Sequence, residues 1–151
     1  MPDVSHSVLV EFTPEQMFSL VDTVEDYPKF LPWCGGTTLL QRDQDTTRAT
    51  ILINYHGIRR SFTTENVKHE PMAMQIRLVE GPFSKLDGSW RFTDFAGRGC
   101  KIEFRLRYEF AGRLLDRLIG PVFHHIAGTL VEAFVKRAGQ VYGSNSVNSE
   151  R

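Results

Sequence analysis

The chain has 151 residues, of which 41% are hydrophobic and 24% charged, and this is typical of one globular domain with a substantial core. Its 18 basic and 18 acidic residues cancel, so no global charge favours nucleic acid, and no DNA partner is expected. The only two cysteines, Cys34 and Cys100, lie outside any C-x-x-C spacing, which argues against a disulfide framework or a zinc site and predicts buried, reduced thiols.

The first residues, "MPDVSHSVLVEF", lack the basic region and the longer apolar run of a signal peptide. We therefore expect a cytoplasmic protein that can also sit peripherally at the inner membrane. Apolar and polar side chains alternate over residues 6–12, which predicts a strand. A helix should follow, because Thr13 suits an N-cap, Pro14 suits the first helical position and Gln16 stands where a capping-box partner would.

The next stretch, "VEDYPKFLPWC" over residues 24–34, suits neither a long helix nor a central strand. Pro28 and Pro32 should limit it to a second short helix and a rigid connector. Its large apolar side chains are expected to cover the open end of the sheet. Two readings stay open: a lid that completes the core, or a gate for a ligand.

Period-two patterning dominates from Gly36 onward, interrupted by turn sequences. Six further strands are predicted, at residues 37–43, 46–55, 59–69, 73–80, 85–94 and 99–110. The last is the clearest, because apolar residues from Cys100 to Phe110 alternate with charged ones. This alternation predicts an antiparallel sheet with one solvated face and one covered face.

The cover should come from the C-terminal segment, where residues 123–142 form a helix with a wide apolar face. Gly120–Pro121 is expected to kink or interrupt that helix. The polar tail, residues 144–151, is expected to be disordered, which leaves a single domain over residues 1–143. A curved sheet of about seven strands around one helix gives an α+β domain, and space between the two layers predicts an internal cavity.

Residues suited to catalysis are few. His124 and His125 are adjacent, so they point in different directions on a helix and cannot share a metal ion. No nucleophile motif is present, and no catalytic residue, metal or required cofactor is predicted. His124 lies at the edge of the apolar face and is either a core histidine or a polar group in a cavity. Arg105 and Arg107 share the solvated face of the last strand, as part of a mixed-charge surface or as a docking patch for an anionic partner such as ribosomal RNA.

Four segments, "VEDYPKFLPWC", "EGPFSKLDGSWRF", "CKIEFRLRYEF" and "VEAFVKRAGQVYG", resemble the coenzyme-Q-binding, START-like branch of the polyketide cyclase/dehydrase superfamily. Bacterial members of that branch are the ribosome-association toxins (RatA). The resemblance spans about residues 5–143. It implies a helix-grip fold, like that of START and Bet v 1 proteins, with an apolar cavity between the sheet and the last helix.

The resemblance also implies three functions. The first is non-catalytic binding of ubiquinone (coenzyme Q) or a similar polyprenyl quinone or lipid, supporting respiration as a carrier or chaperone. The second is association with the large ribosomal subunit, which blocks subunit joining. The third is an aromatase or cyclase activity, for which His124 is the one candidate group. The first is preferred, because burial of apolar surface suffices for affinity.

Predicted cavity residues come from the connector, the turn near Gly81, two strands and the last helix. They are Tyr27, Phe30, Leu31, Trp33, Phe83, Leu86, Trp90, Phe104, His124, Val131 and Phe134. Arg105 and Arg107 are the predicted partner-docking residues.

Overall fold

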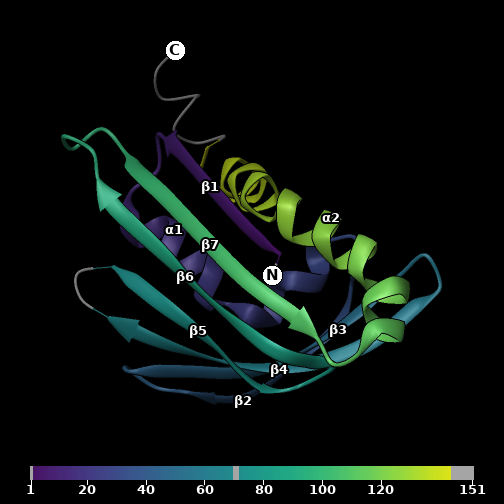
Figure 1. Ribbon diagram of the computed structural model, residues 1–151. Coiled ribbons are helices and arrows are strands. Elements are labelled where there is room, and N and C mark those ends of the chain that lie inside the picture. Colours follow the sequence, from purple (N-terminus) through teal and green to yellow (C-terminus); the bar gives the residue numbers. More distant parts are fainter. Residues whose placement is uncertain (1, 70–71, 144–151) are drawn as a thin grey trace.

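Seven antiparallel strands form one curved sheet, and a long C-terminal helix lies along its inner side (Figure 1). The computed structural model describes residues 2–69 and 72–143. The strand order is β1-β7-β6-β5-β4-β3-β2, so β2 to β7 are joined by successive hairpins and β1 pairs beside β7 at one edge. The predicted α+β helix-grip fold is confirmed.

The strand bounds agree with the predicted pattern to within a few residues. The strands are β1 Asp3–Val10, β2 Cys34–Arg42, β3 Thr46–Tyr55, β4 Ile58–His69, β5 Ala73–Glu80, β6 Phe83–Asp94 and β7 Cys100–Phe110. The helices are α1 Pro14–Asp22, the 3-10 helix η1 Val24–Lys29, α2 Arg113–Ala138 and the π-helical turn η2 Gly139–Gly143. The first strand starts earlier than expected because its ladder with β7 extends back to the pair Asp3 and Arg107.

Both short helices after β1 are present, and a capping box starts the first. The Gln16 amide N–H donates to Thr13 Oγ1 at 3.0 Å, and the Thr13 amide N–H donates to Gln16 Oε1 at 2.9 Å. Pro28 lies inside η1, whose six residues end before Phe30. The prolines therefore limit the second helix to a short 3-10 segment, as expected.

The C-terminal helix is not interrupted at Pro121, which was one of the two effects expected of Gly120–Pro121, and α2 runs without a break from Arg113 to Ala138. A proline in a helix removes one backbone hydrogen bond, but burial of residues on both sides of it, Ile119 and Phe123, holds the two halves as one helix. By length and composition alone, Arg113–Gly143 could also cross a bilayer, although here its buried residues pack on the sheet. The predicted disordered tail, 144–151, lies outside the described residues.

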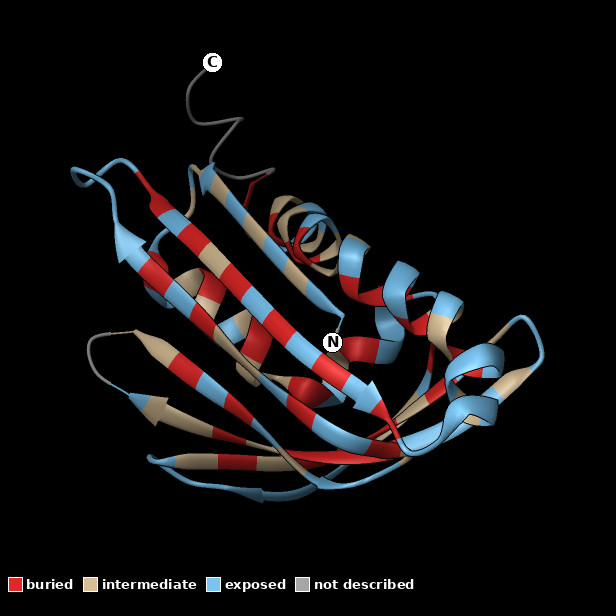
Figure 2. Cartoon of the chain, viewed as in Figure 1, coloured by how far each residue is buried: buried red, intermediate tan, exposed pale blue. Residues whose placement is uncertain are grey.

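The core lies between the inner face of the sheet and α2, and the buried residues are the red segments of the ribbon in Figure 2. Strand β7 alternates regularly, with the inner residues from Cys100 to Phe110 buried. Gly88 lets β6 approach it closely, since a Cβ there would lie 2.4 Å from the Arg105 carbonyl oxygen. Both cysteines are buried and unpaired, as predicted.

Candidate functional site

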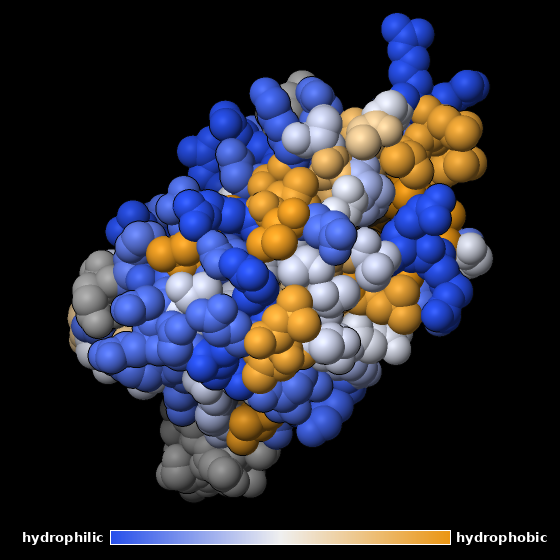
Figure 3. Space-filling model, turned by 90° about the horizontal axis from the view of Figure 1, so that it is seen from below, coloured by the Kyte–Doolittle hydropathy of each residue, from blue (hydrophilic) through white to orange (hydrophobic). Residues whose placement is uncertain are grey.

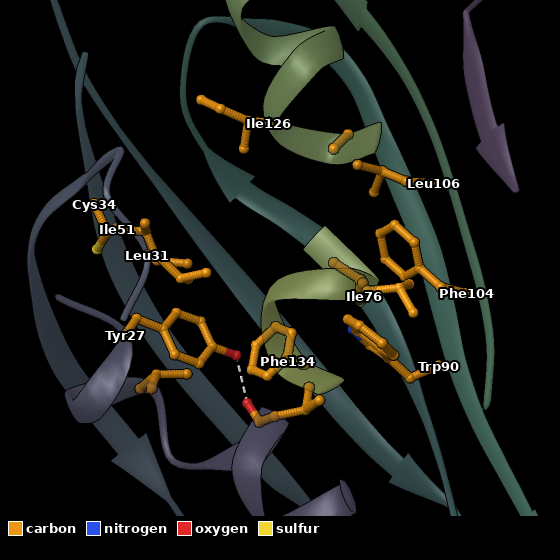
Figure 4. Close-up of a cluster of buried hydrophobic side chains, with 14 of the residues drawn as sticks. Tyr27, Leu31, Cys34, Ile51, Ile76, Trp90, Phe104, Leu106, Ile126 and Phe134 are labelled. Carbon is orange, nitrogen blue, oxygen red and sulfur yellow. Dashed lines mark hydrogen bonds between the residues drawn. The ribbon is translucent and has the colours of Figure 1, made fainter. Parts of the chain in front are cut away.

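An apolar cavity of about 90 Å³ lies between the inner face of the sheet, η1 and α2. Its wall is formed by Tyr27, Trp33, Ile51, Phe62, Thr64, Asn66, Ile76, Leu86, Trp90, Phe104, Leu106, Phe123, Ile126, Ala127, Leu130 and Phe134. Figure 4 shows several of these side chains converging from η1, β3, β5, β6, β7 and α2. Only Thr64 and Asn66 in this wall have predominantly polar side chains.

The lid, residues 24–34, covers one end of this cavity and is fixed at several points. The Tyr27 hydroxyl donates to the Val21 carbonyl oxygen, and its ring packs edge-on to Phe134 with centroids 5.4 Å apart (Figure 4). The backbone N–H of Asn54 on β3 donates a hydrogen bond to the Trp33 carbonyl oxygen at 2.9 Å. Tyr27 and Trp33 are therefore held as part of the cavity wall.

The remaining lid side chains point to other surroundings. The Phe30 ring packs on Phe134 with centroids 5.3 Å apart, and the Arg137 guanidinium carbon lies over the Phe30 ring, 5.2 Å from its centroid. Leu31 is 1% exposed and packs in the core. Both border a shallow groove between the lid and α2 that is separate from the cavity.

Six of the predicted cavity residues line the cavity: Tyr27, Trp33, Leu86, Trp90, Phe104 and Phe134. Three others lie outside its lining. Phe83 packs against Phe123 at a centroid distance of 4.9 Å. Val131 is 1% exposed within the core. His124 is on the exposed side of α2, where its Nδ1 lies 2.9 Å from the Tyr108 hydroxyl oxygen.

Ten lining residues were not predicted as site residues: Ile51, Phe62, Thr64, Asn66, Ile76, Leu106, Phe123, Ile126, Ala127 and Leu130. The four of these residues on α2 belong to the apolar face that the helical pattern identifies, so this pattern could have predicted them as lining residues. Phe62, Thr64 and Asn66 alternate along β4 and share its inner face. Thr64 and Asn66 are polar and would suit the solvated face of the strand equally well, so the sequence alone does not indicate which face they occupy.

Ionisable chemistry is sparse in the cavity wall. Among the described residues, its lining includes no Asp, Glu, Lys, Arg or His. Burial raises the pKa of the Tyr27 hydroxyl far above its usual range, and burial raises the pKa of the Cys100 thiol to about 11. Within residues 2–69 and 72–143, no group of three or more His, Cys, Asp or Glu side chains could hold a metal ion.

A second, open depression of about 440 Å³ lies on the outer face of the sheet over β5, β6 and β7. It brings together Arg91 and both predicted docking residues, Arg105 and Arg107. The cross-strand neighbours of Arg105 are Ser5 and Ser89, so this guanidinium faces uncharged side chains on both sides. Arg107 Nε instead lies 3.5 Å from Asp87 Oδ1.

A curved antiparallel sheet closed by one long helix over an apolar cavity defines a helix-grip protein of the START-like class. Residues 10–135 match the family described as "Polyketide cyclase / dehydrase and lipid transport", and the chain belongs to this family.

Named relatives in this family point in two directions. The chain is 39% identical over 144 residues to the "Ribosome association toxin RatA" of Escherichia coli (strain K12), covering 95% of this chain and 91% of that one. It is 30% identical over 151 residues to "Coenzyme Q-binding protein COQ10 homolog B, mitochondrial" of Xenopus laevis, covering 96% of this chain and 61% of that one. The solution structure of the 18 kDa protein CC1736 from Caulobacter crescentus has a TM-score of 0.72 and 30% identity, covering 95% of this chain and 99% of that one.

Proposed function

We propose that this protein binds a hydrophobic small molecule in the cavity between the sheet and α2, and that the ligand is ubiquinone or a similar polyprenyl quinone or lipid. One observation carries the proposal: an internal cavity whose wall is almost entirely aliphatic and aromatic. Burial of apolar ligand surface is worth about 25 cal/mol per Å², so such a wall supplies affinity without charged groups. The name of the Xenopus relative supports the quinone as ligand.

The cavity volume implies that binding is coupled to a structural change. About 90 Å³ is well below the roughly 300–1,000 Å³ of most small-molecule sites. A polyprenyl quinone therefore enters only if part of the wall moves outward. The lid is the wall segment outside the sheet and α2, and moving it outward would break the hydrogen bond from the Asn54 backbone N–H to the Trp33 carbonyl oxygen and the packing of Tyr27 on Phe134.

The wall also favours binding over turnover. An acid–base reaction needs a titratable group with a suitable pKa next to the substrate. The cavity offers none near neutral pH, and His124, the candidate for a cyclase-type reaction, lies on the exposed side of α2. We infer a carrier or chaperone role, with the ligand as cargo and no required cofactor.

Intrinsic tryptophan fluorescence tests this function directly. Trp33 and Trp90 are the only tryptophans, and both line the cavity. Titration with decylubiquinone, a short-tailed ubiquinone, should quench their emission to saturation, because a bound quinone would lie against both indole rings. A quench that only rises linearly with quinone, as free tryptophan in solution shows, would refute the proposal.

A second function is favoured by the arginine-lined depression on the outer face. We propose that Arg91, Arg105 and Arg107 dock onto phosphates of the large ribosomal subunit. The names of the RatA relatives support association with the ribosome. This site and the cavity lie on opposite sides of the sheet, so the two functions are compatible. Phosphate contacts release counterions, so the association should weaken steeply with salt.

Co-sedimentation with purified large subunits tests the docking site. Arg105→Glu should abolish co-sedimentation at low salt, and Arg107→Glu should weaken it less, because Asp87 already neighbours Arg107. Arg98→Glu, an equal charge change in the exposed turn after β6, is the matched control and should bind like the unaltered protein. Equal binding by Arg105→Glu and Arg98→Glu would contradict this docking site.

One end of the molecule suits contact with a membrane surface. Leu114 and Leu118, in the first turns of α2, are 69% and 54% exposed. Arg59 and Arg60 border a depression beside Leu115 at the same end, and Figure 3 shows hydrophobic atoms gathered beside hydrophilic ones at its upper right. Exposed leucines next to arginines fit an anionic bilayer. We propose a cytoplasmic protein that contacts the inner membrane transiently when it loads its ligand.

A further inference from the structure

One residue of the cavity wall carries a buried polar atom without a partner. Asn66 on β4 is 8% exposed and lines the cavity, and its Oδ1 has no hydrogen-bond partner among the described residues. An unsatisfied acceptor buried in apolar surroundings costs about 1–3 kcal/mol, so such atoms normally have a partner. A partner for this atom would have to be a hydrogen-bond donor that reaches Asn66 at the cavity wall.

The other atom of the same amide is already engaged. Asn66 Nδ2 donates to Met74 Sδ at 3.9 Å, and Met74 is not part of the cavity wall. A thioether sulfur accepts hydrogen bonds but cannot donate them, so this contact favours the amide orientation that leaves Oδ1 free. The polar point in the wall is therefore an acceptor.

Thr64 adds a second polar group to the same place. It lies two residues before Asn66 on β4, so both side chains project from the inner face of one strand. Its hydroxyl can donate as well as accept. Together the two side chains form a small polar spot in a wall that is otherwise apolar.

We propose that the cavity selects hydrophobic molecules that carry a hydroxyl group, and that this hydroxyl donates to Asn66 Oδ1 while Thr64 contacts its oxygen. Prenyl alcohols, phenols and hydroquinones belong to this class; hydrocarbons and ethers do not. For a quinone ligand, the reduced hydroquinone form is then preferred over the oxidised form. This inference rests on the proposed binding function and specifies its ligand.

A matched pair of probes tests the selection: farnesol and farnesyl methyl ether share one prenyl chain, but only farnesol donates a hydrogen bond. Each is titrated against tryptophan fluorescence. Farnesol should bind about five- to tenfold more tightly, as expected for one buried hydrogen bond. Asn66→Leu, which keeps the approximate size of the side chain, should remove this preference while still binding both probes. Gln41→Leu, which removes an exposed side-chain amide on β2 away from the cavity, should retain it.

Each outcome separates the inference from the function on which it rests. If neither probe nor decylubiquinone binds saturably, the binding function itself fails. If both probes bind the unaltered protein equally, an ordered water satisfies Asn66 and the inference is wrong. If the preference persists in Asn66→Leu, the hydroxyl is recognised elsewhere, which also overturns the assignment. Thermal denaturation of each variant shows whether it is folded, so that lost binding is not mistaken for lost structure.

Discussion

Ala127→Leu fills the cavity from α2 and separates ligand binding from stability. Ala127 is 3% exposed and belongs to the cavity wall, so an isobutyl group there occupies space that a ligand would need. Filling a cavity raises the free energy of unfolding by about 24 cal/mol for each Å³ filled. For a cavity of about 90 Å³ the gain is at most about 2 kcal/mol. Overpacking costs about 1–3 kcal/mol. The two effects nearly cancel, so stability should change by about 1 kcal/mol or less.

Ligand binding should respond very differently. Decylubiquinone titration followed by tryptophan fluorescence should show at least about a tenfold loss of affinity, because a buried group of that size now competes with the ligand. Urea denaturation measures the accompanying change in stability. Ala111→Leu makes the same side-chain change at an exposed turn and should leave both measurements unaltered. Undiminished quinone affinity in a folded Ala127→Leu variant would refute the cavity as the binding site.

Three further predictions concern acid stability, membrane contact and the polar spot. Arg42 donates hydrogen bonds that lower the pKa of Glu25 to about 2, so this pair stabilises the fold above the ordinary carboxyl pKa and loses that contribution as pH falls toward 2. Glu25→Gln should therefore flatten the decline of Tm between about pH 4.5 and pH 2. The change should be small because the pair is partly exposed. Leu118→Ser should reduce co-sedimentation with anionic phosphatidylglycerol vesicles, whereas Leu40→Ser, also 54% exposed but on β2, should not; equal losses would contradict the proposed membrane surface. Asn66→Leu should raise the Tm of the ligand-free protein, because it removes an unsatisfied buried acceptor; a Tm lowered by several degrees would show that the amide is already satisfied.

Local chemistry made most of the fold predictable. The capping box at Thr13 and the alternation along β7 each depend on residues close in sequence, and the structure reproduces both. The choice between the two effects expected of Pro121, a kink or an interruption of the helix, could not be made from local sequence. The effect of Pro121 on the helix depends on how firmly the neighbouring turns are packed, and that packing comes from strands far away in the sequence.

The sequence predicts that an apolar cavity exists, but it identifies only some of the residues that line it. Large aromatic residues such as Trp33 and Trp90 stand out by composition, and they do line it. Phe30 has the same character, yet it borders the groove between the lid and α2, where Arg137 lies against its ring. Asn66 could be found only once the sheet was assembled, because its position on the inner face depends on the curvature and register of several strands. The lid itself is fixed by contacts between η1, β3 and α2 that no local pattern contains.

Mass spectrometry of what the purified protein carries tests the central claim most directly. The unaltered protein and Ala127→Leu are purified side by side without detergent, and the organic extract of each is quantified against protein. We predict that the unaltered protein retains one main class of hydrophobic molecule, a polyprenyl quinol or another hydroxylated lipid, and that Ala127→Leu retains at most about a tenth as much. Equal amounts in both extracts, or none from the unaltered protein even after incubation with quinol, would contradict the account.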